Sequence, residues 1–250
     1  MRFGVLFKKH FDHTDRVIKI LNDFGCDFTL LDKEFPKNID FIICFGGDGT
    51  VLRSVPFALR YNVPIVGFNF GKVGYLLNFE FDDFEKVIKI LKEGKFTLDT
   101  RKLLEVKAYQ GEQVVFNGLA LNDAVVFKTV TEKLIYLKLN VDKGDVYEAA
   151  CDGMIISTPT GSTAYSLAAG GVIISPKVPA IITTPITPQV LNIRPMVYAD
   201  SETIEVKLLK FYPATLIVDG VKICELNPND RVVVKKAKEK IRFVTGEKPC

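Results

Sequence analysis

Two glycines, an acid and a third glycine follow a short apolar run at residues 41–45. Five continuous apolar residues are typical of a strand that is buried on both faces of a parallel α/β sheet. Gly46, Gly47 and Gly49 permit positive φ and leave backbone amides open to a ligand oxygen. A helix that opens at Thr50 would add its N-terminal partial charge. We therefore predict a phosphate-binding turn made by these four residues.

Asp48 is the anomaly within this turn. A carboxylate opposes phosphate binding by its charge, so its presence indicates chemistry, such as accepting a proton or orienting a hydroxyl. Gly-Asp-Gly is also a common composition of ordinary turns, and a glycine cluster alone is weak evidence for a phosphate site. Because ligands of open α/β sheets bind where the parallel strands end, the position after a strand favours the functional interpretation.

A second stretch is nearly free of charge. Between Asp152 and Arg194 the only charged residue is Lys177, although hydroxyl side chains are frequent at residues 158–166. Prolines and glycines exclude a membrane helix here, since a broken backbone in lipid leaves amides unsatisfied. Such a surface is typical of a ligand site or a subunit interface, and predicts a homo-oligomer, either a dimer or a tetramer. For some of these residues the alternative is a buried sheet edge whose hydroxyls bond to the backbone.

The first hundred residues follow an α/β pattern. Apolar runs and helical spacing predict strands at 3–7, 28–31, 41–45 and 65–68, and helices at 15–24, after the glycine turn and at 82–92. Asp82 and Glu85 predict a capping box for the last of these helices. Pro56 predicts a kink or an early break in the helix after the turn. These elements predict an α/β domain with a Rossmann-like parallel sheet.

Beyond residue 98 the hydrophobic pattern changes to alternation, for example at 135–141 and 204–208. Asp219-Gly220 between two apolar runs is a strong hairpin signal. The change predicts a domain boundary near residue 100. We expect residues 1–100 to form the α/β domain and residues 101–250 a mainly antiparallel, β-sandwich-like domain. Whether the C-terminal tail returns to the first domain stays open.

The composition excludes several classes of partner. Lys and Arg number 33 against 30 Asp and Glu, so the net charge of +3 provides no basic field for nucleic acid. The five cysteines lack C-x-x-C spacing, and His10 and His13 have no third ligand nearby, which disfavours a resident metal. The apolar run at residues 3–7 is too short for a signal or membrane segment. We expect a soluble cytoplasmic protein without a membrane partner.

Several motifs, taken in order, resemble those of the NAD kinase family. They are Gly46-Gly47-Asp48-Gly49-Thr50, Asn122-Asp123, the segment 152–166, Gly170-Gly171 and Thr184-Pro185-Ile186-Thr187-Pro188. The resemblance runs from the first strand to about residue 225. The glycine motif is shared with diacylglycerol and sphingosine kinases, whereas the segment 152–166 is the more specific signal.

The resemblance implies phosphoryl transfer from ATP to the adenosine 2′-hydroxyl of NAD, which makes NADP, with inorganic polyphosphate as an alternative donor. Asp48 would activate that hydroxyl, with Gly49 beside it, and Mg²⁺ or another divalent cation would arrive with ATP. Arg53, one helical turn further, is placed to meet a phosphate, although a solvated helix arginine is the alternative. The implied contacts to NAD are Asn122, Asp123, Asp152, Thr160, Thr163, Ala164, Tyr165, Ser166, Leu167, Ala168 and Thr187.

General chemistry agrees with these roles. Phosphoryl transfer has a loose transition state, so a protein mainly has to hold the donor and the hydroxyl in line. An Asn-Asp pair presents donors and acceptors to a ribose diol or an adenine edge, and Tyr165 can pack on a base. Asn122-Asp123 can also be a plain turn after a strand. Asp123 stands where the family often has Glu, and Gln189 where it often has His.

Two other functions remain open. A lipid kinase would share Asp48 and its turn, but its acyl pocket would need large apolar residues where residues 160–166 are small and hydroxylated. A non-catalytic dinucleotide sensor would keep Asn122 and Asp123 and would have no need of Asp48.

Overall fold

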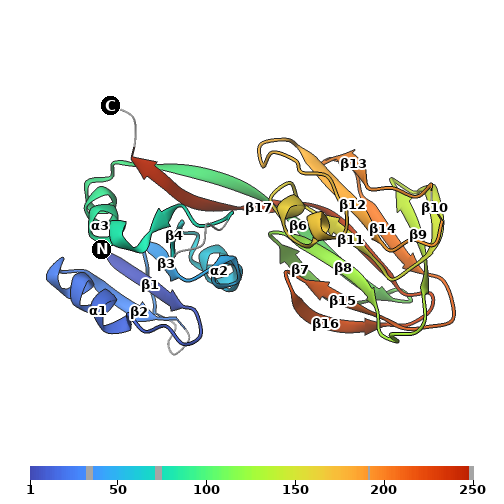
Figure 1. The fold of residues 1–250 in the computed structure, drawn as a ribbon, viewed down its shortest axis with the longest axis horizontal. Coiled ribbons are helices and arrows are strands. Elements are labelled where there is room, and N and C mark those ends of the chain that lie inside the picture. The colour runs from blue at the N-terminus through green and yellow to red at the C-terminus, as the bar shows by residue number, and fades with distance from the viewer. Residues whose placement is uncertain (32–35, 71–74, 191, 248–250) are drawn as a thin grey trace. The chain divides into compact units, whose positions relative to one another are not determined.

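The computed structural model describes residues 1–31, 36–70, 75–190 and 192–247. The chain forms two compact units, one of residues 1–101 with the C-terminal residues from 240 on, the other of residues 102–239 (Figure 1). Strands β6 (Phe96–Gln110) and β17 (Arg231–Glu247) run from one unit into the other, so each of them contributes to both.

A parallel sheet forms the centre of the first unit. Its main strands follow the order β2-β1-β3-β4, and they are β1 (Arg2–Phe7), β2 (Asp27–Leu30), β3 (Phe41–Phe45) and β4 (Ile65–Asn69). The short strand β5 (Phe79–Glu80) and the C-terminal part of β17 also run parallel to β4. Strands β3 and β4 are buried along their whole length, which explains their continuous apolar sequence.

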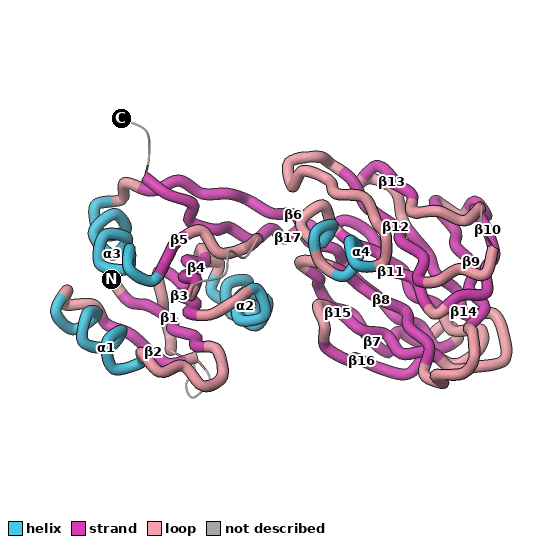
Figure 2. The backbone as a smooth tube through the Cα atoms, in the orientation of Figure 1, coloured by secondary structure: helices cyan, strands magenta, loops and turns pink. Residues whose placement is uncertain are grey.

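Three helices cover this sheet. Helices α1 (Thr14–Asp23) and α3 (Phe84–Glu93) share one apolar core with β1, β3 and β4, and α2 (Asp48–Tyr61) lies on the other side of the sheet (Figure 2). The predicted α/β class is therefore confirmed for this unit.

Two local predictions in this unit are wrong, and of the kink or early break expected at Pro56 the early break does not occur. Helix α2 opens at Asp48, two residues before Thr50, and it continues through Pro56 to Tyr61. A proline removes one backbone N–H donor from a helix, and in α2 the hydrogen bonds of the neighbouring turns keep the helix continuous. The capping box does not form, because a 3₁₀ turn (Phe81–Asp83) precedes α3 and moves the N-cap to Asp83, which makes no side-chain capping bond.

Two sheets make up the second unit. The first contains the N-terminal part of β17 and the strands β6, β7 (Gln113–Ala120), β9 (Ile135–Val141), β10 (Gly144–Cys151) and β14 (Ile204–Leu208). The second follows the order β13-β12-β11-β8-β15-β16, and its strands are β8 (Asp123–Lys128), β11 (Gly153–Ser157), β12 (Ala180–Ile186), β13 (Met196–Ala199), β15 (Ala214–Val218) and β16 (Val221–Leu226).

Alternate side chains of both sheets form one core. Leu137 and Leu139 of β9 and Met154 and Ile156 of β11 belong to it, together with residues of β6, β8, β14, β15 and β17. The strand pairs within the second sheet are all antiparallel. This arrangement confirms the predicted β-sandwich-like class.

The connection after β11 carries the only short helices of the second unit within its described residues. They are a 3₁₀ turn (Gly161–Thr163) and α4 (Tyr165–Ala168). In Figure 1 they lie beside β11. The hydroxyl-rich motif of the sequence thus forms a cap on the second sheet rather than one of its strands.

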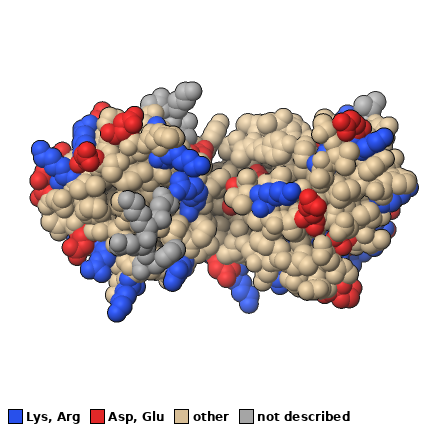
Figure 3. Space-filling view, turned by 90° about the horizontal axis from the view of Figure 1, so that it is seen from below, with Lys and Arg blue, Asp and Glu red and all other residues tan. Residues whose placement is uncertain are grey.

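The face of the molecule drawn in Figure 3 has no large patch of a single charge. Blue Lys and Arg side chains and red Asp and Glu side chains are interspersed there, with uncharged surface between them. Within the described residues, every helix is too short or too polar to cross a membrane.

Candidate functional site

The glycine turn of the first unit joins β3 to α2. Gly47 is the N-cap of α2 and has an extended backbone, with φ −117° and ψ −173°. None of Gly46, Gly47 and Gly49 has positive φ, so the turn does not use the left-handed conformations that glycine permits. A side chain at Gly46 would collide with the Thr50 hydroxyl, whereas a Cβ at Gly47 or Gly49 would meet no atom within 4 Å. Packing explains the first glycine and leaves the other two facing open space.

Asp48 is the first residue of α2 and is half-buried. Its Oδ1 accepts the N–H of Leu76 at 3.2 Å, and its Oδ2 accepts the N–H of Tyr75 at 3.3 Å. Both bonds are long, and a carboxylate offers about four lone-pair positions, so acceptor capacity is left over. One turn later in α2, the Arg53 Nη1 donates to the carbonyl of Phe7 at 3.2 Å.

In the second unit, Asn122 and Asp123 lie where β7 passes into β8. Both are buried, and the exposed fractions of the two residues are 9% and 5%. The Asp219 carboxylate of the β15–β16 turn accepts backbone N–H groups from Leu121, Asn122 and Asp123. The predicted pair thus lies at the bend between the two strands, where these bonds hold its backbone.

The motif at residues 158–161 holds this segment from its other side. The Thr158 N–H donates to the Asn122 carbonyl at 2.9 Å, and the Thr158 hydroxyl donates to the Leu121 carbonyl at 2.6 Å. The N–H of Gly161 returns to the Thr158 hydroxyl at 3.0 Å. A Cβ at Gly161 would overlap the backbone of Asn122, so glycine is required there by close approach.

Several hydroxyls of the charge-poor stretch are satisfied inside the protein. Ser162 donates to the Pro159 carbonyl at 2.7 Å, and Ser166 pairs with Thr184 at 2.8 Å while being fully buried. The alternative of hydroxyls used for structure therefore applies to these residues.

The remaining predicted contacts differ in exposure. Thr160 is buried, and Thr163 and Ala164 are partly exposed. Tyr165, Leu167 and Ala168 are exposed, and the exposed fraction of Tyr165 is 43%. The Tyr165 ring is thus available to stack on a base.

Asp152 lies between β10 and β11 and is paired with Lys128. Its Oδ1 is 2.5 Å from the Lys128 Nζ. Burial raises the pKa of the Asp152 carboxyl, but hydrogen bonds from Lys128 and Thr187 and the Lys128 charge outweigh it and hold the pKa below its usual value. The structure thus brings Asp152 and the predicted Thr187 together by a direct hydrogen bond, and it adds a pair with Lys128 that the sequence pattern did not indicate.

Asp123 has the most unusual carboxyl of the predicted set. Burial and the nearby charge of Asp219 raise its pKa from 3.8 to about 7. Such a group carries a proton part of the time near neutral pH, so it can both donate and accept hydrogen bonds. Perturbed carboxyls of this kind are frequent at functional sites.

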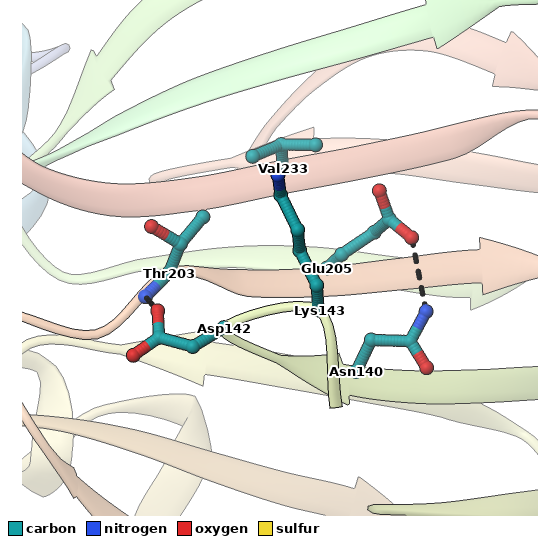
Figure 4. A pocket seen from close by; sticks show the side chains of 6 residues that line it. All are labelled: Asn140, Asp142, Lys143, Thr203, Glu205 and Val233. Atoms are coloured by element: carbon teal, nitrogen blue, oxygen red, sulfur yellow. Dashed lines mark hydrogen bonds between the residues drawn. The ribbon is translucent and has the colours of Figure 1, made fainter. Parts of the chain in front are cut away.

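One pocket of the second unit lies away from these residues. It has a volume of about 470 Å³ and is lined by Asn140, Asp142, Lys143, Thr203, Glu205 and Val233 (Figure 4). Its polar groups pair with one another, since Asn140 donates to Glu205 at 3.0 Å and the Thr203 N–H donates to Asp142 at 2.8 Å. This pairing is incomplete, because the buried Asn140 Oδ1 has no hydrogen-bond partner, and none of the predicted site residues lines this pocket.

A metal site built from side chains is not found among the described residues. No group of three or more His, Cys, Asp or Glu in them could hold an ion. His13 stacks on the rings of Phe70 and Phe81 instead.

Comparison with known proteins identifies the family of this chain. The model of the ATP-NAD kinase N-terminal domain matches residues 8–96, and that of the ATP-NAD kinase C-terminal domain matches residues 121–246. The chain belongs to the ATP-NAD kinase family. An NAD kinase of Desulforamulus reducens is 37% identical to it over 217 residues, which are 86% of this chain and 75% of that protein.

Two solved structures of NAD and NADH kinases share the fold. The crystal structure of an NAD kinase from Archaeoglobus fulgidus in complex with ATP has a TM-score of 0.78 at 27% identity, over 97% of this chain and 93% of that one. The crystal structure of yeast NADH kinase complexed with NADH has a TM-score of 0.87 at 24% identity, over 98% of this chain and 83% of that one. The family resemblance read from the sequence is thus confirmed.

Proposed function

We propose that this chain is an NAD kinase, which transfers the γ-phosphoryl group of ATP to the adenosine 2′-hydroxyl of NAD and so forms NADP. The observation that carries the proposal is the position of Asp48. An acid begins helix α2 directly after a buried parallel strand, between two glycines with open space around them. The helix N-terminus and the bare backbone suit a phosphate, and the acid suits a hydroxyl.

The reaction needs few groups from the protein. The 2′-oxygen forms a bond to the γ-phosphorus, the bond from that phosphorus to the β–γ bridging oxygen breaks, and ADP leaves with the electron pair. Asp48 accepts the proton of the 2′-hydroxyl, or holds that hydroxyl in line. Arg53 and the amides of Gly47 and Gly49 are the groups that we assign to the phosphates.

The dinucleotide contacts are assigned to the second unit. We place Asn122 and Asp123 on a ribose or an adenine edge and the exposed ring of Tyr165 on a base. From the family motifs we also assign to the NAD site Asp152, Thr160, Thr163, Ala164, Ser166, Leu167, Ala168 and Thr187, of which Ser166 is buried and bonded to Thr184. In domain terms, residues 1–100 supply Asp48 and the phosphate-binding turn, and residues 101–250 supply most of the NAD contacts.

Magnesium or another divalent cation enters with ATP in this proposal. The described residues hold no carboxylate cluster that fits a resident ion, and Mg²⁺ usually binds through one or two carboxylates and the phosphates themselves. Inorganic polyphosphate is an alternative donor, since it presents the same phosphates without a base. The cytoplasm is the proposed location, because buried free thiols such as Cys44 and Cys151 suit a reducing compartment.

Self-association is part of the proposal. Eight of the fifteen large apolar side chains that are exposed among the described residues lie between positions 165 and 197. A surface of this kind is typical of a subunit contact, so we expect a dimer or a tetramer. Sedimentation of the purified protein tests this, and a monomer at micromolar concentration would contradict it.

A direct assay tests the main proposal. Purified protein is incubated with NAD, ATP and Mg²⁺, and NADP is measured with an NADP-specific dehydrogenase. A parallel reaction replaces NAD by diacylglycerol vesicles. Formation of NADP is the expected result. Phosphorylated lipid would favour the lipid kinase, and NAD binding without turnover under any divalent ion would favour the sensor.

A further inference from the structure

The Asp219 carboxylate makes an unusual set of contacts. It accepts three consecutive backbone N–H groups, from Leu121 at 2.8 Å, Asn122 at 2.7 Å and Asp123 at 3.1 Å. In return, the N–H of Asp219 donates to the Asp123 carbonyl at 3.0 Å. Consecutive amides that converge on one anion form a concave anion site, here filled by a side chain of the protein itself.

The segment that Asp219 holds is restrained on its far side as well. Thr158 bonds to the carbonyls of both Leu121 and Asn122, and Gly161 approaches the Asn122 backbone so closely that no Cβ fits. The backbone from Leu121 to Asp123 therefore has donors and acceptors engaged in both directions. The side chains of Asn122 and Asp123 are therefore attached to a restrained backbone.

The turn itself does not require an acid at this position. Asp219 has φ 47° and Gly220 has φ 78°, which is the backbone of a two-residue hairpin turn that Asn-Gly forms as readily as Asp-Gly. The acid is therefore explained by its carboxylate contacts rather than by the hairpin.

We propose that Asp219 is the positioning residue of the dinucleotide site: it fixes Asn122 and Asp123 through their backbone and contacts no substrate itself. The proposal rests on the assignment of Asn122 and Asp123 to NAD. The proposal adds to that site Asp219, which lies far from Asn122 and Asp123 in the sequence and acts on both.

A second consequence follows from the charge of Asp219. Among the described residues, Asp219 is the charged group that acts on Asp123, while Ser157 lies directly across the strand pair with a buried hydroxyl that has no hydrogen-bond partner. Three N–H donors oppose the rise that burial causes in the pKa of Asp219, and burial and Asp219 raise the pKa of Asp123 to about 7. Burial thus raises the pKa of both carboxyls, and Asp123 is the one whose pKa reaches about 7.

An ionised Asp123 accepts both hydroxyls of a ribose, as acidic residues do in dinucleotide sites. The KM for NAD should therefore fall as the pH rises through about 7. Removal of the Asp219 charge should move this inflection to lower pH. A residue that only stabilises the fold would leave the inflection where it is.

The chain offers a matched control in Asp142. Asp142 and Lys143 have φ 47° and 67° in the β9–β10 turn, and the Asp142 carboxylate accepts the Thr203 N–H at 2.8 Å (Figure 4). The N–H of Asp142 donates to the Thr203 carbonyl at 3.0 Å. Asp142 resembles Asp219 in its turn backbone and in the reciprocal bond to the chain, although its carboxylate accepts one N–H where that of Asp219 accepts three. The loop that it holds contains none of the predicted site residues.

The experiment compares Asp219→Asn with Asp142→Asn. Steady-state kinetics are measured from about pH 5 to 9, with melting temperature on the same preparations. We expect Asp219→Asn to raise the KM for NAD about tenfold or more, since one amide then faces the Asn amide group, and to change the KM for ATP less than about twofold. We expect Asp142→Asn to lower the melting temperature alone.

Equal kinetic effects of the two variants, or an unmoved inflection in folded Asp219→Asn, would overturn the inference. If Asp219→Asn does not fold, Asp123→Asn decides, because it keeps the three amide bonds and removes the titrating group. Its KM for NAD should then be independent of pH near 7, and a retained inflection would contradict the inference. A wild-type protein that neither binds NAD nor forms NADP would instead refute the proposed function.

Discussion

Two aspartates, Asp48 and Asp123, carry the proposed chemistry in opposite surroundings. Asp48 is half-buried at the start of a helix, where two backbone N–H groups reach its carboxylate and glycines leave open space beside it. Asp123 is buried at the start of a strand, next to a second carboxylate that raises its pKa to about 7. The comparison shows that the surroundings decide what an aspartate can do. Backbone N–H groups bond to the carboxylate of Asp48, whereas burial and a neighbouring carboxylate oppose the charge of Asp123.

The largest effect is expected for Asp48. Asp48→Asn should lower kcat by about 10² to 10⁴-fold, the range of general acid-base assistance, because the amide cannot accept the hydroxyl proton. The melting temperature should hardly change, since an Asn oxygen can still accept an N–H from Tyr75 or Leu76. Nearly normal turnover together with lost stability would show that Asp48 only shapes the turn.

The effect of Asn122 should be smaller and should appear in binding. Asn122→Ala leaves partner groups of the ligand unsatisfied, so NAD binding should weaken by about 1 to 3 kcal/mol. Calorimetric titrations with NAD and with ATP measure both affinities on one preparation. A variant that loses ATP affinity and keeps NAD affinity would reverse the assignment of the two nucleotides.

The raised pKa of Asp123 should make the free energy of unfolding depend on pH. Between its usual pKa of 3.8 and its folded-state value of about 7, the folded chain holds a proton that the unfolded chain has released. The free energy of unfolding should therefore fall as the pH rises through this window, and Asp123→Asn should flatten the curve. Denaturant titrations of both proteins across the window provide the test, and parallel curves would show that Asp123 is not the responsible group.

The smallest effect is expected for Asp152. Its pKa is lowered, so its pairing with Lys128 stabilises the fold above the usual value of 3.8, and this contribution is lost as the pH falls through the lowered pKa. Asp152→Asn should cost about 1 kcal/mol and also raise the KM for NAD. Asp200, which pairs with Lys102 at 2.7 Å and with Lys236 at 3.0 Å, is the control outside the predicted site. Asp200→Asn should lose similar stability with an unchanged KM, and equal KM effects would remove Asp152 from the site.

Local patterns predicted the elements that local interactions decide. The apolar run of β3 and the Asp219-Gly220 hairpin both lie where their sequences indicated. Alternation at residues 135–141 likewise predicted β9, because a half-buried strand imposes a period of two.

The predictions that were wrong concern features that depend on the rest of the fold, which a short stretch of sequence does not specify. A 3₁₀ turn forms where the capping box at Asp82 was expected. Pro56 did not end α2, since packing of the rest of the helix outweighs one missing hydrogen bond. Gly47 and Gly49 do not use the positive φ that glycine permits, and a Cβ at either would meet no atom within 4 Å. Asp219 could not be found from sequence patterns, because it meets Leu121 across 98 positions of the chain.

The account as a whole depends on the atom that receives the phosphoryl group. A single-turnover reaction of enzyme, ATP and Mg²⁺ with NAD, and in parallel with NAD that lacks the adenosine 2′-hydroxyl, tests this most directly. The account predicts NADP from NAD, no phosphorylated product from the deoxy compound, and at least a 10²-fold slower transfer to NAD when Asp48→Asn replaces the wild-type protein. Phosphorylation of the deoxy compound, or an undiminished rate in Asp48→Asn, would contradict it.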